Sequence, residues 1–424
     1  MVVKAAWVGV VAVVAAALLV TGTLSGTERA PRSASSQPSV GAKVAAVDKS
    51  WCDHRHERLR CIADEAGLRA VVYRGNPASK DLVFWDPGGP GLGLPDADAS
   101  LDILVPRSVK HQNLLLVVEP WVRRPPSAAC ARGSFDATPG PVCALETLAT
   151  TPQSIRTAVD LAERRTGMKM VGAYLQSFGA TRSVPALVGV RGVRWIVLES
   201  PGPVPGADAG RLIRARVGAL RDLLADSCDS AGCNERVRAA VGRFGKSGAV
   251  KTSGRELALG LIAAATLPDQ NHRFLATVAR ELDAGVVAER TAVRLRFLGR
   301  LYEGKRPGAV ISPSVIALWA DTCPRLTGWR DLARARDALL SAYSWTFRGC
   351  LSSVWGSSPA VERVAHLSVP VLMLTGRRDP VVPPSVQRGW LRLGESVRVI
   401  AGRGHFWEDS SVVLQVRRWI AEKG

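Results

Sequence analysis

The sequence has few of the side chains that proteins use to stack on nucleic-acid bases. Only 4 Tyr and 8 Phe occur among 424 residues, and no zinc-finger or RNP-like motif is present. The formal charge of +19 comes from 56 basic and 37 acidic residues, but the arginines are scattered and never form a block of five or six. The charge therefore indicates an arginine-rich solvated surface, leaves attraction to an anionic cell envelope open, and does not favour nucleic acid as a partner.

Long apolar runs are also scarce, because only one occurs, from Ala5 to Val20. A single run excludes a polytopic membrane protein. It follows Lys4 and precedes a segment rich in Ser, Thr, Gly and Pro that extends to Val40, which is the layout of an export signal. We interpret residues 1–40 as a cleaved signal peptide, or a retained anchor, plus a linker. The protein is expected to be secreted or associated with the cell envelope, outside the cytoplasm.

No Cys-x-x-Cys pair is present, so a cysteine metal site is not expected, and we predict no metal and no cofactor. An even number of cysteines in an exported chain indicates disulfides, since these bonds persist in oxidising compartments. The sequence allows many connectivities. Pairing of sequence neighbours would give Cys52–Cys61, Cys130–Cys143, Cys228–Cys233 and Cys323–Cys350.

Short apolar runs alternate with helical patterns in the first half of the chain and again at its end. Such alternation predicts an α/β fold, with a mostly parallel sheet and helices on both faces. Helices are expected after Thr151-Pro152, over Phe178–Val188 and over Ser411–Glu422. The expected strands are Asp81–Trp85, Leu114–Val118, Met168–Tyr174, Val193–Leu198, Val369–Leu374 and Val397–Ile400.

The strand pattern is missing between Gly206 and Ala365. Helical stretches replace it, at Arg211–Ala225, Glu256–Leu267 and Arg273–Leu282. We therefore predict an inserted helical cap over residues 206–365, between two parts of one core at 41–205 and 366–424.

Three residues with catalytic chemistry follow predicted strands. Ser177 lies between a strand and a helix, where its hydroxyl and the amide of Phe178 would face the same spot. Asp379 and His405 follow the last two strands. The carboxyl ends of parallel strands converge on one crevice, and the chain order Ser, Asp, His is that of a hydrolase triad.

Each of these residues also has a simpler structural explanation. A serine after a strand commonly caps the next helix, and an aspartate beside a proline, like Asp379, is typical of a turn. Ser200 lies in a frame similar to that of Ser177, but the Gly- and Pro-rich segment after it cannot start a helix. His405 is the only histidine that follows both Ser177 and Asp379, and this combination favours catalysis.

A glycine-rich segment, residues 86–91, follows the strand at Asp81–Trp85 and reads Asp-Pro-Gly-Gly-Pro-Gly. Its simplest interpretation is a tight turn. Alternatively, its bare backbone could bring an N–H close to an acyl oxyanion without an intervening side chain.

Together these motifs resemble the α/β-hydrolase-fold serine peptidases of the proline iminopeptidase and tripeptidyl aminopeptidase type, especially secreted actinobacterial ones. The resemblance runs from about Trp51 to the C-terminus. The matching motifs are Gly88-Gly89-Pro90-Gly91 for G-G-P-G, Ser177-Phe178-Gly179 for S-[YF]-G, Val197-Leu198-Glu199 for V-L-D, Gly376-Arg377-Arg378-Asp379-Pro380 for G-x-x-D-P, and Gly404-His405 for the closing G-H.

The resemblance implies Ser177 as nucleophile, His405 as base and Asp379 as the residue that orients it, with oxyanion-hole amides from Gly89 and Phe178. Two motifs differ from the family pattern. Leu175 stands where the turn before the serine normally begins with glycine, so this turn needs extra space or is shifted. Residues 119–127 replace the family's D-x-R-G-x-G-x-S and lack its glycines, which indicates a remodelled loop.

The implied function is an exported serine hydrolase, a peptidase that releases residues or short peptides from peptide N-termini through an acyl-enzyme. Exopeptidases hold the substrate ammonium with a carboxylate, for which Glu199 and Asp321 are the candidates. Two alternatives remain. The chain could be a carboxylic-ester hydrolase with the same triad, or a non-catalytic envelope protein on a hydrolase scaffold.

Overall fold

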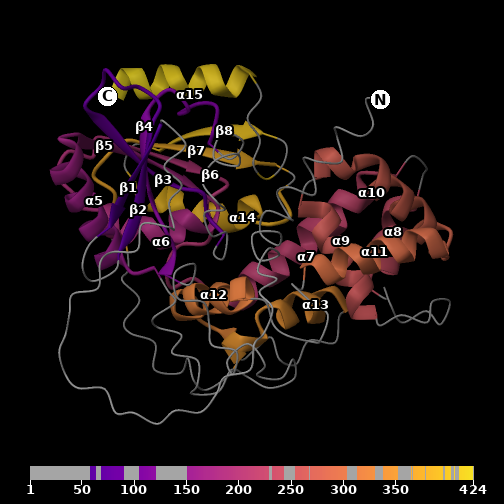
Figure 1. The fold of residues 1–424 in the computed structure, drawn as a ribbon. Coiled ribbons are helices and arrows are strands. Elements are labelled where there is room, and N and C mark those ends of the chain that lie inside the picture. Colours follow the sequence, from indigo (N-terminus) through magenta and orange to yellow (C-terminus); the bar gives the residue numbers. More distant parts are fainter. Residues whose placement is uncertain are drawn as a thin grey trace, which may run out of the picture.

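The computed structural model shows one mixed sheet flanked by helices, with a separate group of helices beside it (Figure 1). The sheet strands are β1 Leu59–Ala63, β2 Arg69–Arg74, β3 Asp81–Asp86, β4 Asn113–Val117, β5 Lys169–Gln176, β6 Trp195–Glu199, β7 Val371–Gly376 and β8 Val397–Gly402. The residues that the structure describes are 58–63, 68–89, 105–120, 150–228, 232–242, 254–266, 268–302, 313–329, 338–351, 364, 366–377, 379–394, 397–402, 405 and 410–423.

The strand order is β1-β2-β4-β3-β5-β6-β7-β8. Strand β2 pairs antiparallel with both β1 and β4, and the remaining neighbours pair in parallel. This is the α/β-hydrolase fold, so the predicted fold is confirmed. All six predicted strands occur, and the first two strands are additional. Because β3 to β8 are parallel, the segments that follow them meet at one edge of the sheet.

Helices cover both faces of the sheet because successive side chains of its central strands are apolar, so both faces must be buried. Helices α5 Pro152–Thr166 and α6 Phe178–Leu187 pack on one face, and α15 Ser410–Lys423 packs on the other (Figure 1). Helix α5 begins at a capping box in which Thr151 and Ser154 bind each other's backbone amides, and it ends at Gly167 with φ 69°.

The cap has an apolar core of its own, built from residues between Ala209 and Cys350. Its helices are α7 Ala209–Ala225, α8 Cys233–Gly242, α9 Gly254–Thr266, α10 Pro268–Asp283, α11 Glu289–Tyr302, α12 Pro313–Thr322 and α13 Ala338–Thr346, with 3₁₀ turns η2 Cys323–Arg325 and η4 Arg348–Leu351. In Figure 1 helices α8 to α11 lie beside the sheet, and α12 lies near α6. The described part of the segment that lacks the strand pattern is therefore helical, as predicted.

Two of the four predicted disulfides are present. Cys228–Cys233 has a Cα–Cα distance of 5.8 Å and Cys323–Cys350 one of 5.0 Å. Cys61 is also disulfide-bonded. The other cysteines, at positions 52, 130 and 143, lie outside the described residues, as does the predicted export segment at 1–40. Within the described part of the chain, no helix is long and apolar enough to cross a membrane.

Candidate active site

Ser177 lies on a sharp turn between β5 and α6. Its φ of 48° and ψ of −128° fall in a region that non-glycine residues rarely occupy. Two hydrogen bonds hold this conformation: the Ser177 amide donates to the Glu199 carbonyl (2.8 Å), and the Gly202 amide donates to the Ser177 carbonyl (2.6 Å). The Ser177 side chain does not cap α6, so the capping explanation does not apply to this described helix.

Leu175 does not displace this turn. It is 0% exposed, lies in strand β5 and pairs in register with Leu198 and Asp86. Its side chain belongs to the apolar cluster that also contains Ala180 of α6. The strand pairing is therefore regular at Leu175.

Asp379 and His405 are in direct contact. His405 Nδ1 lies 2.7 Å from Asp379 Oδ2, and both side chains are buried. The other oxygen, Asp379 Oδ1, accepts hydrogen bonds from the amides of Val381 (2.8 Å) and Val382 (2.9 Å). The carboxylate is thus fixed from two sides and can orient the imidazole through Nδ1.

The glycine loop after β3 lies against the serine turn. A Cβ added to Gly88 would be 2.5 Å from the Gln176 carbonyl oxygen and 3.0 Å from Ser177 Cβ, and Gly88 has φ 84°. Gly89 also has a positive φ, of 107°. Glycine at position 88 therefore permits both the conformation and the close approach to Ser177.

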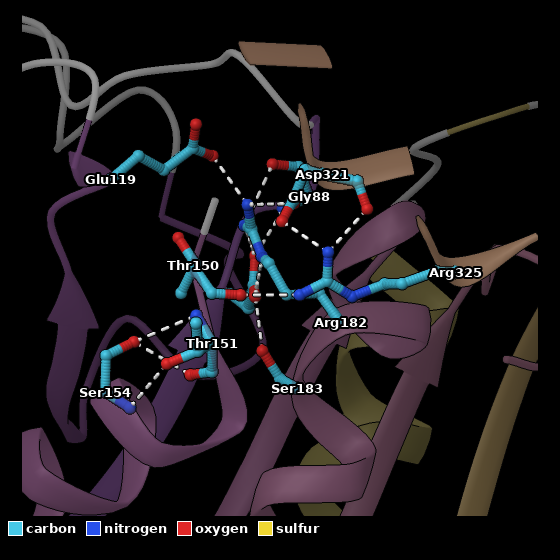
Figure 2. A network of polar contacts seen from close by, with 10 residues as sticks. Gly88, Glu119, Thr150, Thr151, Ser154, Arg182, Ser183, Asp321 and Arg325 are labelled. Carbon is cyan, nitrogen blue, oxygen red and sulfur yellow. Dashed lines mark hydrogen bonds and ion pairs between the residues drawn. The ribbon is translucent and has the colours of Figure 1, made fainter. Parts of the chain in front are cut away.

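A buried charge cluster fixes this loop, and Arg182 of α6 is at its centre (Figure 2). Arg182 Nη2 and Nε bind the two oxygens of Asp86 at 2.6 and 3.0 Å. Its Nη1 binds Glu119 Oε1 at 2.7 Å and Asp321 Oδ2 at 3.0 Å. Burial by itself lowers the pKa of a guanidinium, but the charges of the three carboxylates raise the pKa of Arg182 well above its usual value. The side chain therefore stays charged.

Glu199, one of the two carboxylates suggested for binding an ammonium group, is buried in the sheet. Its side chain is 1% exposed and accepts hydrogen bonds from Gln176 Nε2 (2.6 Å) and the Tyr174 hydroxyl (3.1 Å). Gln176 in turn accepts one from Trp85 Nε1 at 2.9 Å. Because these partners lie along adjacent strands, Glu199 supports the serine turn from within the sheet.

Asp321, the other suggested carboxylate, is also buried. Its side chain is 3% exposed, and its two oxygens contact Arg182 Nη1 and Arg325 Nη1, the latter at 2.6 Å. Both carboxylates that the sequence suggested for binding an ammonium group are therefore engaged within the protein. Residue type and position along the chain do not reveal these buried partners, and a role in binding an ammonium group stays a prediction.

The sequence reasoning missed Arg182, Asp86 and Glu119. One signal was available, since Arg182 is the only charged residue of the helix Phe178–Leu187, which is otherwise apolar or small. A lone charge on a buried helix requires buried partners. Among all the described residues, no group of three or more His, Cys, Asp or Glu side chains could hold a metal ion.

Comparisons with known proteins give similarity only at the level of solved structures. No family model and no curated protein matches the chain. An α/β hydrolase fold protein from Nakamurella multipartita is 14% identical, with a TM-score of 0.37 over 86% of this chain and 98% of that one. Esterase RhEst1 from Rhodococcus sp. ECU1013 is 14% identical, with a TM-score of 0.35 over 87% and 100%. Haloalkane dehalogenase DatA from Agrobacterium tumefaciens C58 is 12% identical, with a TM-score of 0.36 over 86% and 97%.

Proposed function

We propose that the protein is a serine hydrolase that works through an acyl-enzyme on Ser177. The observation that carries the proposal is the strained conformation of Ser177 at a turn where its side chain has no capping role. Strain of this kind at a non-glycine residue costs about 1–3 kcal/mol and persists where function requires it. The His405–Asp379 pair, which follows two neighbouring strands of the same sheet, supplies the base that such a serine needs.

The chemistry follows from these groups. Asp379 holds Nδ1 of His405, so the other ring nitrogen, Nε2, takes the proton of the Ser177 hydroxyl as the oxygen attacks the substrate carbonyl. The amides of Gly89 and Phe178 stabilise the resulting oxyanion. His405 then gives the proton to the leaving group. In the second half, His405 takes a proton from a water molecule, whose oxygen attacks the acyl carbonyl, and returns the proton to Ser177 as the acid product leaves.

Labelling with a fluorophosphonate probe tests this proposal. The wild-type protein should be labelled, and mass spectrometry should locate the adduct on Ser177. The Ser177→Ala variant should lose labelling and lower turnover by a factor on the order of 10⁴ or more while it remains folded. Ser200→Ala is the matched control, because Ser200 also has a positive φ (43°) but is fully buried. This variant should be labelled at Ser177 to the same extent as wild type. A wild-type protein that is not labelled would support the non-catalytic scaffold instead.

We further propose a peptidase that acts on peptide N-termini, on the strength of the motifs shared with the aminopeptidases named above. One observation favours the ester-hydrolase alternative: Glu199 and Asp321 are both engaged with other side chains. Three chromogenic substrates separate these alternatives: a free aminoacyl anilide, its N-acetylated form and an aryl ester. Cleavage of the free anilide but not of the acetylated one supports the peptidase, and cleavage of the ester alone supports the esterase.

We also propose that the protein acts outside the cytoplasm. The bonds Cys228–Cys233 and Cys323–Cys350 support this, because disulfides of this kind persist in oxidising compartments. Fractionation of cells that express the chain with and without residues 1–40 tests it. Retention of the full chain in the cytoplasm would contradict it.

A further inference from the structure

Arg182 connects three parts of the molecule that are distant in sequence. It lies five residues after Ser177, in the second turn of α6, and its side chain is 5% exposed. Its partners are Asp86 at the end of β3, Glu119 after β4, and Asp321 in the last turn of the cap helix α12. Figure 2 shows the guanidinium between Glu119, Gly88 and Asp321.

On the core side, Arg182 determines where the glycine loop lies. The Gly88 amide donates to Asp86 Oδ1 at 2.9 Å, and Arg182 Nη2 donates to the Gly88 carbonyl at 3.4 Å. Asp86 is itself held by the two-pronged contact with Arg182 and by the Ser183 hydroxyl at 2.5 Å. The Arg182 guanidinium thus contacts the backbone that leads into Gly89 both directly and through Asp86.

On the cap side, the same guanidinium is one of the points where the cap meets the core. Asp321 binds Arg182 with one oxygen and Arg325 with the other. Arg325 extends further into the core, where its Nη2 donates to the Thr150 carbonyl at 2.5 Å (Figure 2). A cap that moved away would take a carboxylate from Arg182 and leave a buried positive charge less well compensated.

We propose that Arg182 is a positioning residue that couples docking of the cap, through Asp321, to placement of the Gly88–Gly89 backbone over Ser177. The proposal rests on the serine-hydrolase function above and goes beyond it. The oxyanion hole is then complete only while the cap is docked. A displacement of about 1 Å in such a donor can lower the rate about 100-fold, so a small shift of the loop is sufficient.

Kinetics of two variants and one control test the coupling. Arg182→Lys keeps the charge but cannot make the two-pronged contact with Asp86. It should lower kcat and the rate of fluorophosphonate labelling by at least tenfold, with KM changed less than threefold. Asp321→Asn should lower both rates by threefold or more. The control is Arg156→Met, because Arg156 binds the carbonyls of Pro185 and Ala186 at the other end of α6 and should leave both rates within twofold.

Hydrogen exchange measures the coupling without reference to activity. In Asp321→Asn the amides of peptides covering residues 82–89 should exchange at least threefold faster than in wild type, and in Arg156→Met they should not. The proposal would be overturned by unchanged exchange in Asp321→Asn. It would also be overturned if Arg182→Lys lowered kcat/KM only through a higher KM, with kcat unchanged. If wild type is not labelled at Ser177, the proposed function fails, and the exchange result still decides whether cap and loop are coupled.

Discussion

Among the described residues two serines have a positive φ, and the environment of each decides its chemistry. Ser177 has φ 48° and Ser200 has φ 43°, and both follow parallel strands. Ser200 is fully buried, whereas Ser177 is 6% exposed beside the glycine loop. The amide of Ser177 is bound by Glu199 and its carbonyl by Gly202, so the strain is stored in a backbone that neighbouring strands and loops hold fixed.

Gly88→Ala should impair catalysis more than folding. Its Cβ would lie 2.5 Å from the Gln176 carbonyl, so the loop must move away from Ser177. We expect the labelling rate to fall at least tenfold. Gly167→Ala is the matched control: Gly167 also has a positive φ (69°), but nothing lies within 4 Å of an added Cβ. It should cost about 1 kcal/mol of unfolding free energy and leave labelling unchanged. Equal labelling rates for the two variants would contradict this account.

Leu175→Gly restores the glycine of the family pattern but should not raise activity. Leu175 is fully buried, so its removal leaves a cavity and adds backbone entropy. Removing a buried leucine side chain costs about 2–5 kcal/mol, and glycine within a strand adds about 1 kcal/mol. Urea denaturation should show this loss, with the labelling rate of the folded protein at or below that of wild type. A faster rate would mean that Leu175 distorts the turn.

At the scale of elements, the second half of the cap carries the contact with Arg182. Helix α12 ends at Thr322, directly after Asp321, and turn η2 begins with Cys323. The Cys323–Cys350 disulfide joins η2 to η4, and Trp319 of α12 donates to the Thr346 carbonyl at 2.8 Å. These bonds hold α12, and with it Asp321, in a fixed position.

Loss of the Cys323–Cys350 bond should therefore affect stability more than loss of Cys228–Cys233. The first closes a loop with a sequence separation of 27 and the second one of 5. From loop entropy, we expect losses of about 3.5 and about 2 kcal/mol for the two Cys-to-Ser double variants. Denaturant titration of each variant checks the order. Since α12 carries Asp321, only the Cys323/Cys350 variant should also slow labelling at Ser177.

At the scale of the whole molecule, cap and core each have their own apolar cluster. The cap cluster contains only residues between Ala209 and Cys350, and the two clusters on the sheet faces contain none of these. The described contacts between cap and core include packing of Val386 of the core against the cap cluster. They also include the Arg182 cluster, the bond from Arg325 Nη2 to the Thr150 carbonyl at 2.5 Å, and the bond from Arg216 Nε to the Val381 carbonyl at 2.5 Å, next to Asp379.

A cap in this position should restrict the substrate to small or unfolded molecules. We expect cleavage of short peptides or small esters, and no cleavage of internal bonds in a folded protein. Mass spectrometry of a folded test protein after long incubation checks this, with its denatured and fragmented form as control. Efficient internal cleavage of the folded form would contradict the role given to the cap.

Much of the fold and of the proposed site could be predicted from the sequence because the signals are local. A run of apolar residues bounded by turn residues identifies a strand such as Asp81–Asp86, and the serine turn is contained in five consecutive residues. Strand β2 carries the same signal in the apolar run at residues 70–73, which the prediction missed. Strand β1 has no such run, because Arg60 interrupts it, and antiparallel pairing with β2, as between Cys61 and Val71, supports it.

The sequence by itself determined the alternation of strands β3 to β8 with helices and the positions of Ser177, Asp379 and His405 after parallel strands. Only the tertiary structure decided which charges meet. Arg182 is 96 residues from Asp86, 63 from Glu119 and 139 from Asp321, so no local pattern links them. A buried charge requires an opposite charge beside it, and the fold decides which opposite charges come near. For that reason Asp321, a possible substrate anchor in the sequence, contacts an arginine in the structure.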